Sequence, residues 1–298
     1  MTKHTIYDNV RQPGNPIGVL WIIADVEVEQ VLPTSVAWQT KARGVETHIM
    51  NRGDFCVTGG ELFFRGERVE RLPDVAFVRR FCKELFDYLE NSHVRLVNSV
   101  GCIRTCRDKL AAYKALQAHG IPQPRTVHFE TEIDYQELVN LLGVDFIAKG
   151  RFGREGTDVF VIKEAQDLMR IQKPEQYIFQ ENIKTSYGRG LRINAVGGEA
   201  VNAILNTDEF DFRSNLETSN DVPCELTPEM SALTSEVAKI LGGDVLGLDF
   251  LFGEGGKLIL CEVNSSPLIY GDEQREIRTK IAEFLAVTVR SRSRNPNN

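Results

Sequence analysis

The sequence lacks the usual marks of secreted, membrane-spanning and nucleic-acid-binding proteins. Its six cysteines form no CxxC pair and no cysteine–histidine spacing of a metal site, which favours reduced thiols in a cytoplasm. It has no run of about 18 apolar residues that could cross a bilayer, and its first residues have no apolar signal core. The net charge of −7 gives no overall basic field for nucleic acid or an anionic membrane. We therefore expect a cytoplasmic protein that binds neither.

Two common phosphate-binding motifs are also missing. No GxGxxG opens the first expected helix, so no dinucleotide site is indicated. No GxxxxGK[ST] loop is present either, which excludes a Walker-type P-loop. Any nucleotide site in this chain must therefore be built in another way.

The first third of the chain has the pattern of a small α/β layer. Ile17–Ala24 and Val45–Met50 are apolar runs typical of buried strands, and Glu29–Arg43 between them has a helical pattern. A further strand is expected at Asp74–Arg79, after a small hairpin in residues 55–70. Alternating strands and helices predict an open sheet, which we expect to end near Asn98.

Three later helices have clear end signals. Thr105 to Asp108 spell an [ST]xx[DE] capping box, which predicts a helix over Lys109–His119. Thr227 followed by proline predicts another helix, ending at Leu241. The last helix is expected at residues 273–289, with a polar, disordered tail over residues 291–298.

The most informative stretch is an expected antiparallel hairpin made of Val245–Phe252 and Lys257–Val263. Alternate residues of a strand point to one face, so Glu262 and Asn264 project together and Asp249 can stand opposite them. Two carboxylates and an amide oxygen suit a hard cation such as Mg²⁺. The alternative is a solvated edge hairpin, but the apolar residues on both faces of these strands argue against it.

A second chemical signal is the strand pair Asp145–Lys149 and Asp158–Ile162, joined by GRFGREGT. Glycines allow backbone N–H groups to wrap an anion, and Lys149 at the strand end adds a positive charge. An ordinary flexible hairpin is the alternative for this loop. The glycines expected near phosphate are Gly150, Gly153 and Gly156.

Further polar residues follow the short apolar strand Tyr177–Gln180. At such a strand end, backbone groups can pair with an adenine edge while a carboxylate such as Glu181 reaches a sugar hydroxyl. Arg192 and Arg213 then occur in apolar or neutral surroundings, which suits clamping of phosphate or carboxylate.

These signals occur in one order along the chain: RDKL, the strand-end lysine before the glycine loop, QENI, GRGLRINAVGG, FRSNL, LDFLF and EVNSSP. That series resembles the ATP-grasp superfamily, and most closely its RimK-like branch of carboxylate–amine ligases. The resemblance covers about Asn98 to the final helix and, weakly, the α/β unit before it. It implies an ATP-grasp fold of α/β and α+β class with a small N-terminal α/β (pre-ATP-grasp) domain. The implied division is 1–98 for that domain, 99–184 for the central and lid subdomain, and 185–298 for the C-terminal subdomain with the metal site.

The resemblance also implies a role for each motif residue. ATP would lie between two subdomains, with two Mg²⁺ ions, for which Mn²⁺ could substitute, held by Asp249, Glu262 and Asn264. The nucleotide contacts would come from Lys109, Lys149, Gly153, Gly156, Glu181, Asn182, Ile183 and Asn215. The catalytic arginines would be Arg192, facing the transferring phosphate, and Arg213, facing the phosphates or the bound carboxylate.

The implied reaction joins a carboxylate to an amine through an acylphosphate and releases ADP and phosphate. The substrates would be an acid and an amino acid or peptide, and the enzyme a homodimer or homotetramer. Two departures from the family pattern, Gly190 in GRGLR and Leu268 after SSP, predict an altered acceptor pocket.

Three other functions compete with this one. A peptide macrocyclase that forms ester or amide links would share the fold. A non-catalytic ATP-binding regulator is disfavoured by the intact acid set, and an ATP-grasp phosphotransferase by the lack of any histidine after Lys149.

Overall fold

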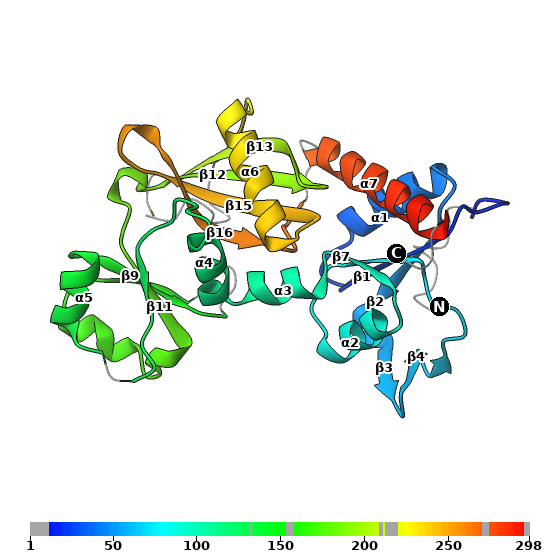
Figure 1. The fold of residues 1–298 in the computed structure, drawn as a ribbon, viewed down its shortest axis with the longest axis horizontal. Coiled ribbons are helices and arrows are strands. Elements are labelled where there is room, and N and C mark those ends of the chain that lie inside the picture. Colours follow the sequence, from blue (N-terminus) through cyan, green and yellow to red (C-terminus); the bar gives the residue numbers. More distant parts are fainter. Residues whose placement is uncertain are drawn as a thin grey trace. The chain divides into compact units, whose positions relative to one another are not determined.

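The computed structural model describes residues 12–131, 133–152, 158–208, 211, 220–269 and 274–294, and these form two compact units. The first unit combines Met1–Ile103, Gly242–Val245 and Ser266–Asn298. The second combines Arg104–Leu241 with Leu246–Ser265. The division at residues 98 and 184 stays a prediction. Figure 1 follows the chain through both units by colour.

Unit 1 is built on a parallel sheet with the strand order β2-β1-β6-β7. The chain places β2 on one side of β1 and then β6 on the other, so the strand order reverses between β1 and β6. Apolar residues of these strands pack with helix α2 in one core, where Phe86 and Leu89 are fully buried. The elements are β1 (Val19–Ala24), α1 (Val31–Ala42), β2 (Glu46–Asn51), β6 (Val75–Val78), α2 (Lys83–Asn91) and β7 (Arg95–Val97).

Residues from the far end of the chain complete this unit. Helix α7 (Arg275–Arg294) packs against α1 and against β1 and β6, and it buries Ile277, Ile281 and Leu285. The last helix predicted from the sequence is thus confirmed, but it continues beyond its expected end at residue 289. The disordered tail predicted from residue 291 is therefore wrong as far as Arg294. The hairpin expected at residues 55–70 is a small sheet of β3 (Phe55–Thr58), β4 (Glu61–Phe64) and β5 (Glu67–Arg68).

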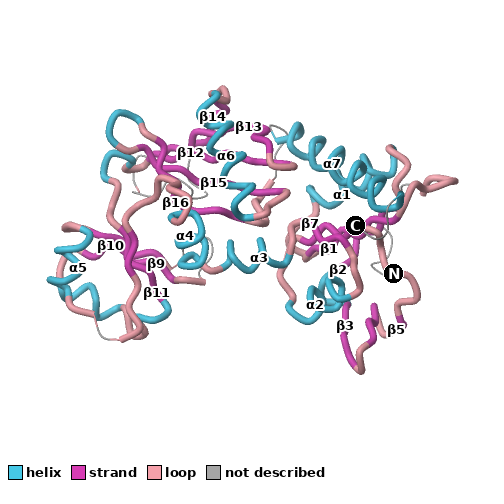
Figure 2. The backbone as a smooth tube through the Cα atoms, in the orientation of Figure 1, coloured by secondary structure: helices cyan, strands magenta, loops and turns pink. Residues whose placement is uncertain are grey.

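Unit 2 contains two antiparallel sheets. The smaller has the order β10-β9-β11-β8 and packs around the fully buried Phe146 and Phe179. Its elements are β8 (Thr126–Val127), α5 (Tyr135–Leu142), β9 (Phe146–Gly150), β10 (Val159–Ile162) and β11 (Tyr177–Gln180). The tube in Figure 2 shows the strands β9, β10 and β11 side by side with α5 next to them.

The larger sheet has the order β14-β13-β12-β15-β16, and helix α6 packs against β12, β13 and α4. The Thr227 hydroxyl accepts a hydrogen bond from the Met230 amide at 3.2 Å, which confirms the expected start of α6. The elements are α4 (Lys109–Gln117), β12 (Arg189–Val196), β13 (Glu199–Thr207), β14 (Asn220–Cys224), α6 (Pro228–Leu241), β15 (Val245–Phe252) and β16 (Leu258–Asn264). Short 3₁₀ segments are η1 (Arg52–Asp54), η2 (Ala165–Arg170), η3 (Pro174–Gln176), η4 (Lys184–Ser186) and η5 (Glu254–Gly256).

The start of α4 differs from the predicted capping box. Thr105 lies inside a separate helix, α3 (Val100–Arg107), so it does not cap α4. Asp108 is the cap instead, because its carboxylate accepts hydrogen bonds from the amides of Leu110 and Ala111. The predicted helix is confirmed, but its first turn is held by a different residue.

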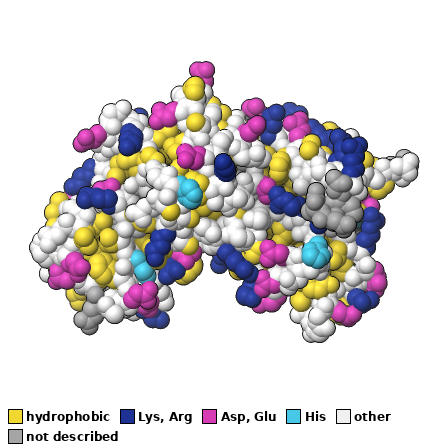
Figure 3. Space-filling model, in the orientation of Figure 1, with side chains coloured by type: hydrophobic (Ala, Val, Ile, Leu, Met, Phe, Trp, Pro, Cys, Tyr) yellow, Lys and Arg dark blue, Asp and Glu magenta, His cyan; other side chains and the backbone are white. Residues whose placement is uncertain are grey.

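No helix in the described part of the chain is long and apolar enough to cross a bilayer. On the face drawn in Figure 3, basic and acidic side chains are interspersed.

Candidate functional site

The acidic residues of the hairpin face each other as their spacing predicts. Asp249 on β15 lies opposite Glu262 on β16, and Gly247 lies opposite Asn264. The amide nitrogen of Asn264 donates a hydrogen bond to Asp249 Oδ2 at 3.0 Å. The two carboxylates and the amide are therefore gathered on adjacent strands of one sheet.

A β-bulge modifies this part of β16. Asp249 pairs with Glu262 but the next residue, Phe250, pairs with Leu260, so Cys261 is an extra residue without its own partner on β15. The alternation of buried and exposed side chains along β16 breaks at this point. Leu258, Leu260 and Val263 are buried, while Cys261, Glu262 and Asn264 are partly exposed. The bulge thus brings Cys261 to the same face as Glu262 and Asn264, the two metal-ligand candidates on β16.

Three basic side chains converge on this face. The Arg192 guanidinium donates two hydrogen bonds to Asp249, both at 2.7 Å, in the bidentate geometry typical of arginine and carboxylate. Lys109 Nζ lies 3.2 Å from Glu262 Oε1. Lys149 Nζ donates to Cys261 Sγ at 3.1 Å. The predicted residues Lys109, Lys149 and Arg192 are thus brought together with the predicted acids.

Neighbouring groups hold Lys149 and Arg192 in their charged forms. Burial alone would lower the pKa of Lys149, but Cys261, Glu262 and Asp249 raise it above its ordinary value. Asp249 is likewise the main cause of the raised pKa of Arg192, against the opposing effect of burial. The three basic side chains on this face suit the binding of an anionic ligand.

A third ion pair ties the helix that carries Lys109 to the strand that carries Lys149. Arg151, just after β9, donates hydrogen bonds to both oxygens of Asp108, at 2.7 and 2.6 Å. The Lys109 amide also donates to the Arg151 carbonyl at 3.0 Å. Burial alone would raise the pKa of Asp108, but the hydrogen bonds from Arg151 and the Ala111 amide lower it below its usual value. The two predicted phosphate lysines are therefore held in fixed relation.

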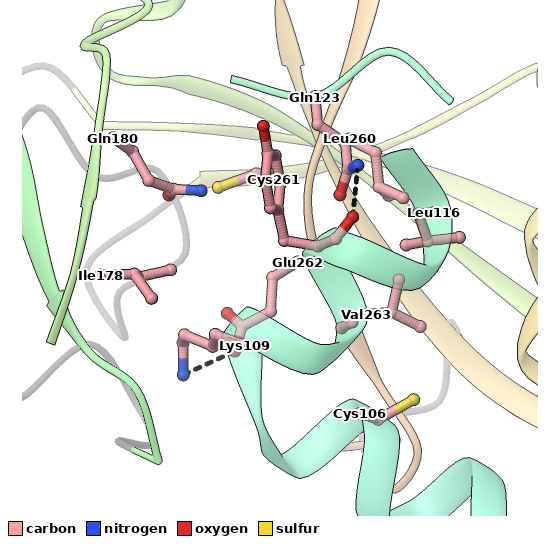
Figure 4. Close-up of a pocket in the computed structure, with 12 residues that line it drawn as sticks. Cys106, Lys109, Leu116, Gln123, Ile178, Gln180, Leu260, Cys261, Glu262 and Val263 are labelled. Carbon is pink, nitrogen blue, oxygen red and sulfur yellow. Dashed lines mark hydrogen bonds and ion pairs between the residues drawn. The ribbon is translucent and has the colours of Figure 1, made fainter. Parts of the chain in front are cut away.

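A pocket lies beside these groups within unit 2. It is partly open to solvent. Lys109 and Glu262 form an ion pair at its edge, while Ile178 and Gln180 on β11 and Cys261 on β16 line it (Figure 4). Apolar Leu116, Leu260 and Val263 complete a lining suited to a flat, mostly apolar group.

Gln180 in this pocket has an amide whose orientation is fixed by its neighbours. The Thr126 hydroxyl donates to the Pro124 carbonyl at 2.9 Å, so its oxygen accepts from Gln180 Nε2, also at 2.9 Å. Gln180 Oε1 is then a buried acceptor with no hydrogen-bond partner in the described structure. Sequence reasoning missed both Gln180 and Cys261, since neither an apolar-strand glutamine nor a lone cysteine has a distinctive pattern.

The remaining predicted residues lie away from this cluster or outside the described residues. Glu181 accepts hydrogen bonds from the backbone amide and the guanidinium of Arg125, at 2.9 and 2.6 Å, and Asn182 and Ile183 lie in the turn after β11. Gly190 pairs with Asn206 within β12, and Leu268 is about half exposed. Gly153, Gly156, Arg213 and Asn215 lie outside the described residues.

The donor set at the bulge fits a hard divalent cation. Among the described residues, His, Cys, Asp and Glu side chains alone form no group of three or more that could hold a metal ion, so a site here needs the amide of Asn264 as well. Asp249, Glu262 and Asn264 offer only oxygen donors in a set of two carboxylates and one amide. Mg²⁺ accepts such a set because it keeps several waters and takes other ligands from phosphate.

Comparison with known proteins finds a matching family model and several named relatives. The model of the RimK-like ATP-grasp domain matches residues 106–289. The chain is 28% identical over 273 residues to beta-citrylglutamate synthase B of Danio rerio, covering 83% of this chain and 67% of that protein. It is 33% identical over 218 residues to a probable alpha-L-glutamate ligase of Aeromonas salmonicida, covering 70% and 72%. These names, synthase and ligase, belong to the enzyme class that the sequence predicts.

The fold is shared with a solved ATP-grasp ligase. The structure of PsnB, complexed with a phosphomimetic variant of its minimal precursor, Mg and ADP, matches with a TM-score of 0.69. The identity is 16%, and the match covers 94% of this chain and 99% of PsnB. The predicted fold and family are thereby confirmed: the chain belongs to the RimK-like ATP-grasp family.

Proposed function

We propose that this protein is an ATP-dependent ligase that joins a carboxylate to an amine and releases ADP and phosphate. The observation that carries the proposal is the convergence of Lys109, Lys149 and Arg192 on the acid pair Asp249 and Glu262. Positive groups suit the phosphates of ATP, and the acids suit the cation that accompanies them. One face of unit 2 thus offers partners for both parts of a metal nucleotide.

The phosphates would meet the three cations. Lys109 at the first turn of α4 and Lys149 at the end of β9 would contact the phosphate chain. Arg192 is proposed to face the phosphoryl group that is transferred, where its planar donors can bind two oxygens. Each such fixed charge contributes typically a few kcal/mol to the transition state, about a hundredfold in rate. Outside the described residues, Gly153, Gly156, Arg213 and Asn215 are proposed to add further phosphate or carboxylate contacts.

Asp249, Glu262 and Asn264 are proposed to hold Mg²⁺, with two ions and replacement by Mn²⁺ as part of the proposal. Bound magnesium would offset the negative charge of the phosphates during transfer. Asp249 pairs with Arg192 and Glu262 with Lys109. A bound cation would therefore compete with these two side chains for the carboxylate oxygens.

The base of ATP is proposed to enter the pocket beside Glu262. Ile178 and Leu260 supply apolar contact for a purine, and Gln180 Oε1 supplies an acceptor for an amino group. Glu181 is proposed to bind the ribose, with the backbone of Asn182 and Ile183 at the adenine edge. Glu181 would then exchange its present bonds with Arg125 for a sugar hydroxyl.

The reaction proposed is two successive substitutions. An oxygen of the substrate carboxylate attacks the γ-phosphorus of ATP, the bond to the β-phosphate oxygen breaks, and ADP leaves. The amine then attacks the carbonyl carbon of the acylphosphate, inorganic phosphate leaves and the amine gives up a proton. Activation is needed because a free carboxylate is a poor electrophile, and Arg192 stays in place throughout to balance the transferring charge.

The substrates are proposed to be an acid and an amino acid or peptide. Glutamate is the first amine to test, because the related proteins are named for glutamate products or for glutamate ligation. A cytoplasmic homodimer or homotetramer completes the proposal.

The test is phosphate release from ATP and Mg²⁺ across a panel of amino acids, dipeptides and acidic peptides. Glu262→Gln is the inactive variant, and Glu254→Gln is its control because Glu254 is exposed in the turn of the same hairpin. We expect one acid–amine pair to drive release in the wild type and in Glu254→Gln but not in Glu262→Gln. Release in Glu262→Gln equal to the wild type would refute the site. ATP binding without turnover on any pair would instead favour a regulator.

A further inference from the structure

The two ends of the segment that joins β9 to β10 are anchored by side chains that the proposed reaction does not use. Arg151 follows β9 and pairs with Asp108 at the start of α4. Asp158 precedes β10, and its Oδ1 accepts a hydrogen bond from the Tyr177 hydroxyl on β11 at 2.8 Å. The first end of the segment is thus fixed to a helix, and the second end to a strand of its own sheet.

Arg151 connects three elements of unit 2. Its guanidinium gives bidentate hydrogen bonds to Asp108, its amide donates to the Gln176 carbonyl at 2.7 Å, and its carbonyl accepts from the Lys109 amide. The side chains of Arg151 and Asp108 are only 26% and 15% exposed, so water screens this pair incompletely. Asp108 also caps α4, so one carboxylate fixes both the first turn of the helix and the end of β9.

The two lysines proposed to bind phosphate lie on either side of this ion pair. Lys109 is the residue after Asp108, and Lys149 lies two residues before Arg151. Both lysines also contact β16, but a metal nucleotide would compete for those contacts. The pair of Asp108 and Arg151 involves none of the residues proposed to bind the cation, so it can persist when the site is loaded.

The guanidinium of Arg151 is committed to this pairing. Its Nε and Nη2 both donate to Asp108, and its central carbon lies 5.2 Å from the centre of the Phe152 ring. Stacking on an aromatic face is favourable for arginine and restrains its position further. The arrangement therefore favours an indirect role for Arg151 over direct binding of phosphate.

We propose that Asp108 and Arg151 are positioning residues that hold Lys109 and Lys149 at the separation required by the phosphate chain of ATP. Lysine carries a point charge on a flexible stem, so two lysines bind one ligand well only when their backbones are fixed relative to each other. Preorganisation of this kind reduces the cost of ordering the site when the ligand binds. The inference rests on the proposed function, since it assigns the pair a role in binding the ATP of that reaction.

Binding of a non-hydrolysable ATP analogue with Mg²⁺, measured by calorimetry, tests this role without turnover. Asp108→Asn keeps a capping side chain but loses the charge, and Arg151→Gln loses the guanidinium. We expect each change to weaken analogue binding about tenfold, and the double variant to be no weaker than either single one, because both changes break the same pair. Arg151→Lys keeps the charge but not the bidentate geometry, so it should give a smaller loss of about threefold.

Adenosine separates positioning of the lysines from general damage to the site. It has no phosphates, so its binding, measured by saturation-transfer NMR, should be the same in the wild type and in these variants. Tyr177→Phe is the matched control, because it removes the hydrogen bond to Asp158 at the other end of the segment and leaves the contacts with α4 in place. This control should bind the analogue as the wild type does, and circular dichroism should show that every variant is folded.

Three results would overturn the proposal. The first is analogue binding that is unchanged in Asp108→Asn and Arg151→Gln. The second is a loss in Arg151→Gln alone, which would make Arg151 a direct phosphate ligand. The third is an equal loss of adenosine and analogue binding, which would make the pair merely structural. Failure of the ligase itself would show instead as no phosphate release for any acid–amine pair while the variants still bind the analogue more weakly than the wild type.

Discussion

Replacing Asp249 by asparagine separates the two roles of this carboxylate. Asp249 accepts two hydrogen bonds from Arg192 and one from Asn264, so the change keeps the shape but removes the charge from the centre of the network. One of the two oxygens becomes an NH₂ group, which cannot accept from Arg192 or bind a cation. The variant should therefore lose stability and metal affinity together.

The expected loss of stability follows from how deeply the Arg192–Asp249 ion pair is buried. Removing one partner of a fully buried ion pair costs about 3 to 5 kcal/mol. The side chains of Arg192 and Asp249 remain 21% and 16% exposed, so we expect a smaller loss of about 1 to 3 kcal/mol in the free energy of unfolding. Loss of one charged group at the reacting phosphates should lower the rate about a hundredfold to a thousandfold.

Urea unfolding and phosphate release at varied Mg²⁺ would measure both effects. Asp249→Asn should require much more Mg²⁺ for half-maximal rate, whereas Glu254→Gln should match the wild type in both assays. A variant with wild-type dependence on Mg²⁺ and a rate within about threefold of the wild type would contradict the metal role of Asp249. A lower rate with an unchanged Mg²⁺ requirement would assign Asp249 to the positioning of Arg192 alone.

Three further changes test other parts of the molecule. Gln180→Leu should reduce the preference for ATP over GTP by about tenfold in KM, because an acceptor for the adenine amino group is lost; an unchanged ratio would remove Gln180 from base recognition. Asn98→Ala should cost about 3 kcal/mol in urea unfolding, since Asn98 bonds the backbone of Asp244 and Val245 at 2.6 to 2.8 Å, and a loss below about 1 kcal/mol would contradict this. Asp108 has a lowered pKa, so its contribution to stability is present above its unfolded pKa of about 3.9 and lost as pH falls through the lower folded value. The difference in urea midpoint between wild type and Asp108→Asn should thus be constant from pH 5 to 8 and disappear in strong acid; a difference that persisted there would refute the charge role.

The arrangement of the hairpin could be predicted because strand alternation is a strong local rule. A pattern of apolar residues on both sides of Asp249 and Glu262 fixes which side chains share a face, and a slip by one residue would bury the acids. The same rule could not reveal the bulge at Cys261, since an extra residue is visible only against the register of the partner strand. Pairing of Cys261 with Lys149 was missed for that reason.

The packing of elements that are far apart in the sequence also could not be predicted. The stripe of Ile277, Ile281 and Leu285 predicts a buried face for α7 but not the surface it covers, which is α1 and the unit 1 sheet. The capping error has a local cause: Thr105 and Asp108 match a capping box, yet Asp108 caps the helix itself. Several residues can supply a first-turn acceptor, so the pattern alone does not choose among them.

The bulge also bears on how this strand can vary in length during evolution. Deleting the codon of Cys261 would leave Leu260 opposite Phe250 and Glu262 opposite Asp249, so every remaining side chain would keep its face. Such a deletion removes only the thiol beside Lys149. Sequences of this family that are one residue shorter at this point are therefore expected to keep the fold and the acids while giving the lysine a different neighbour.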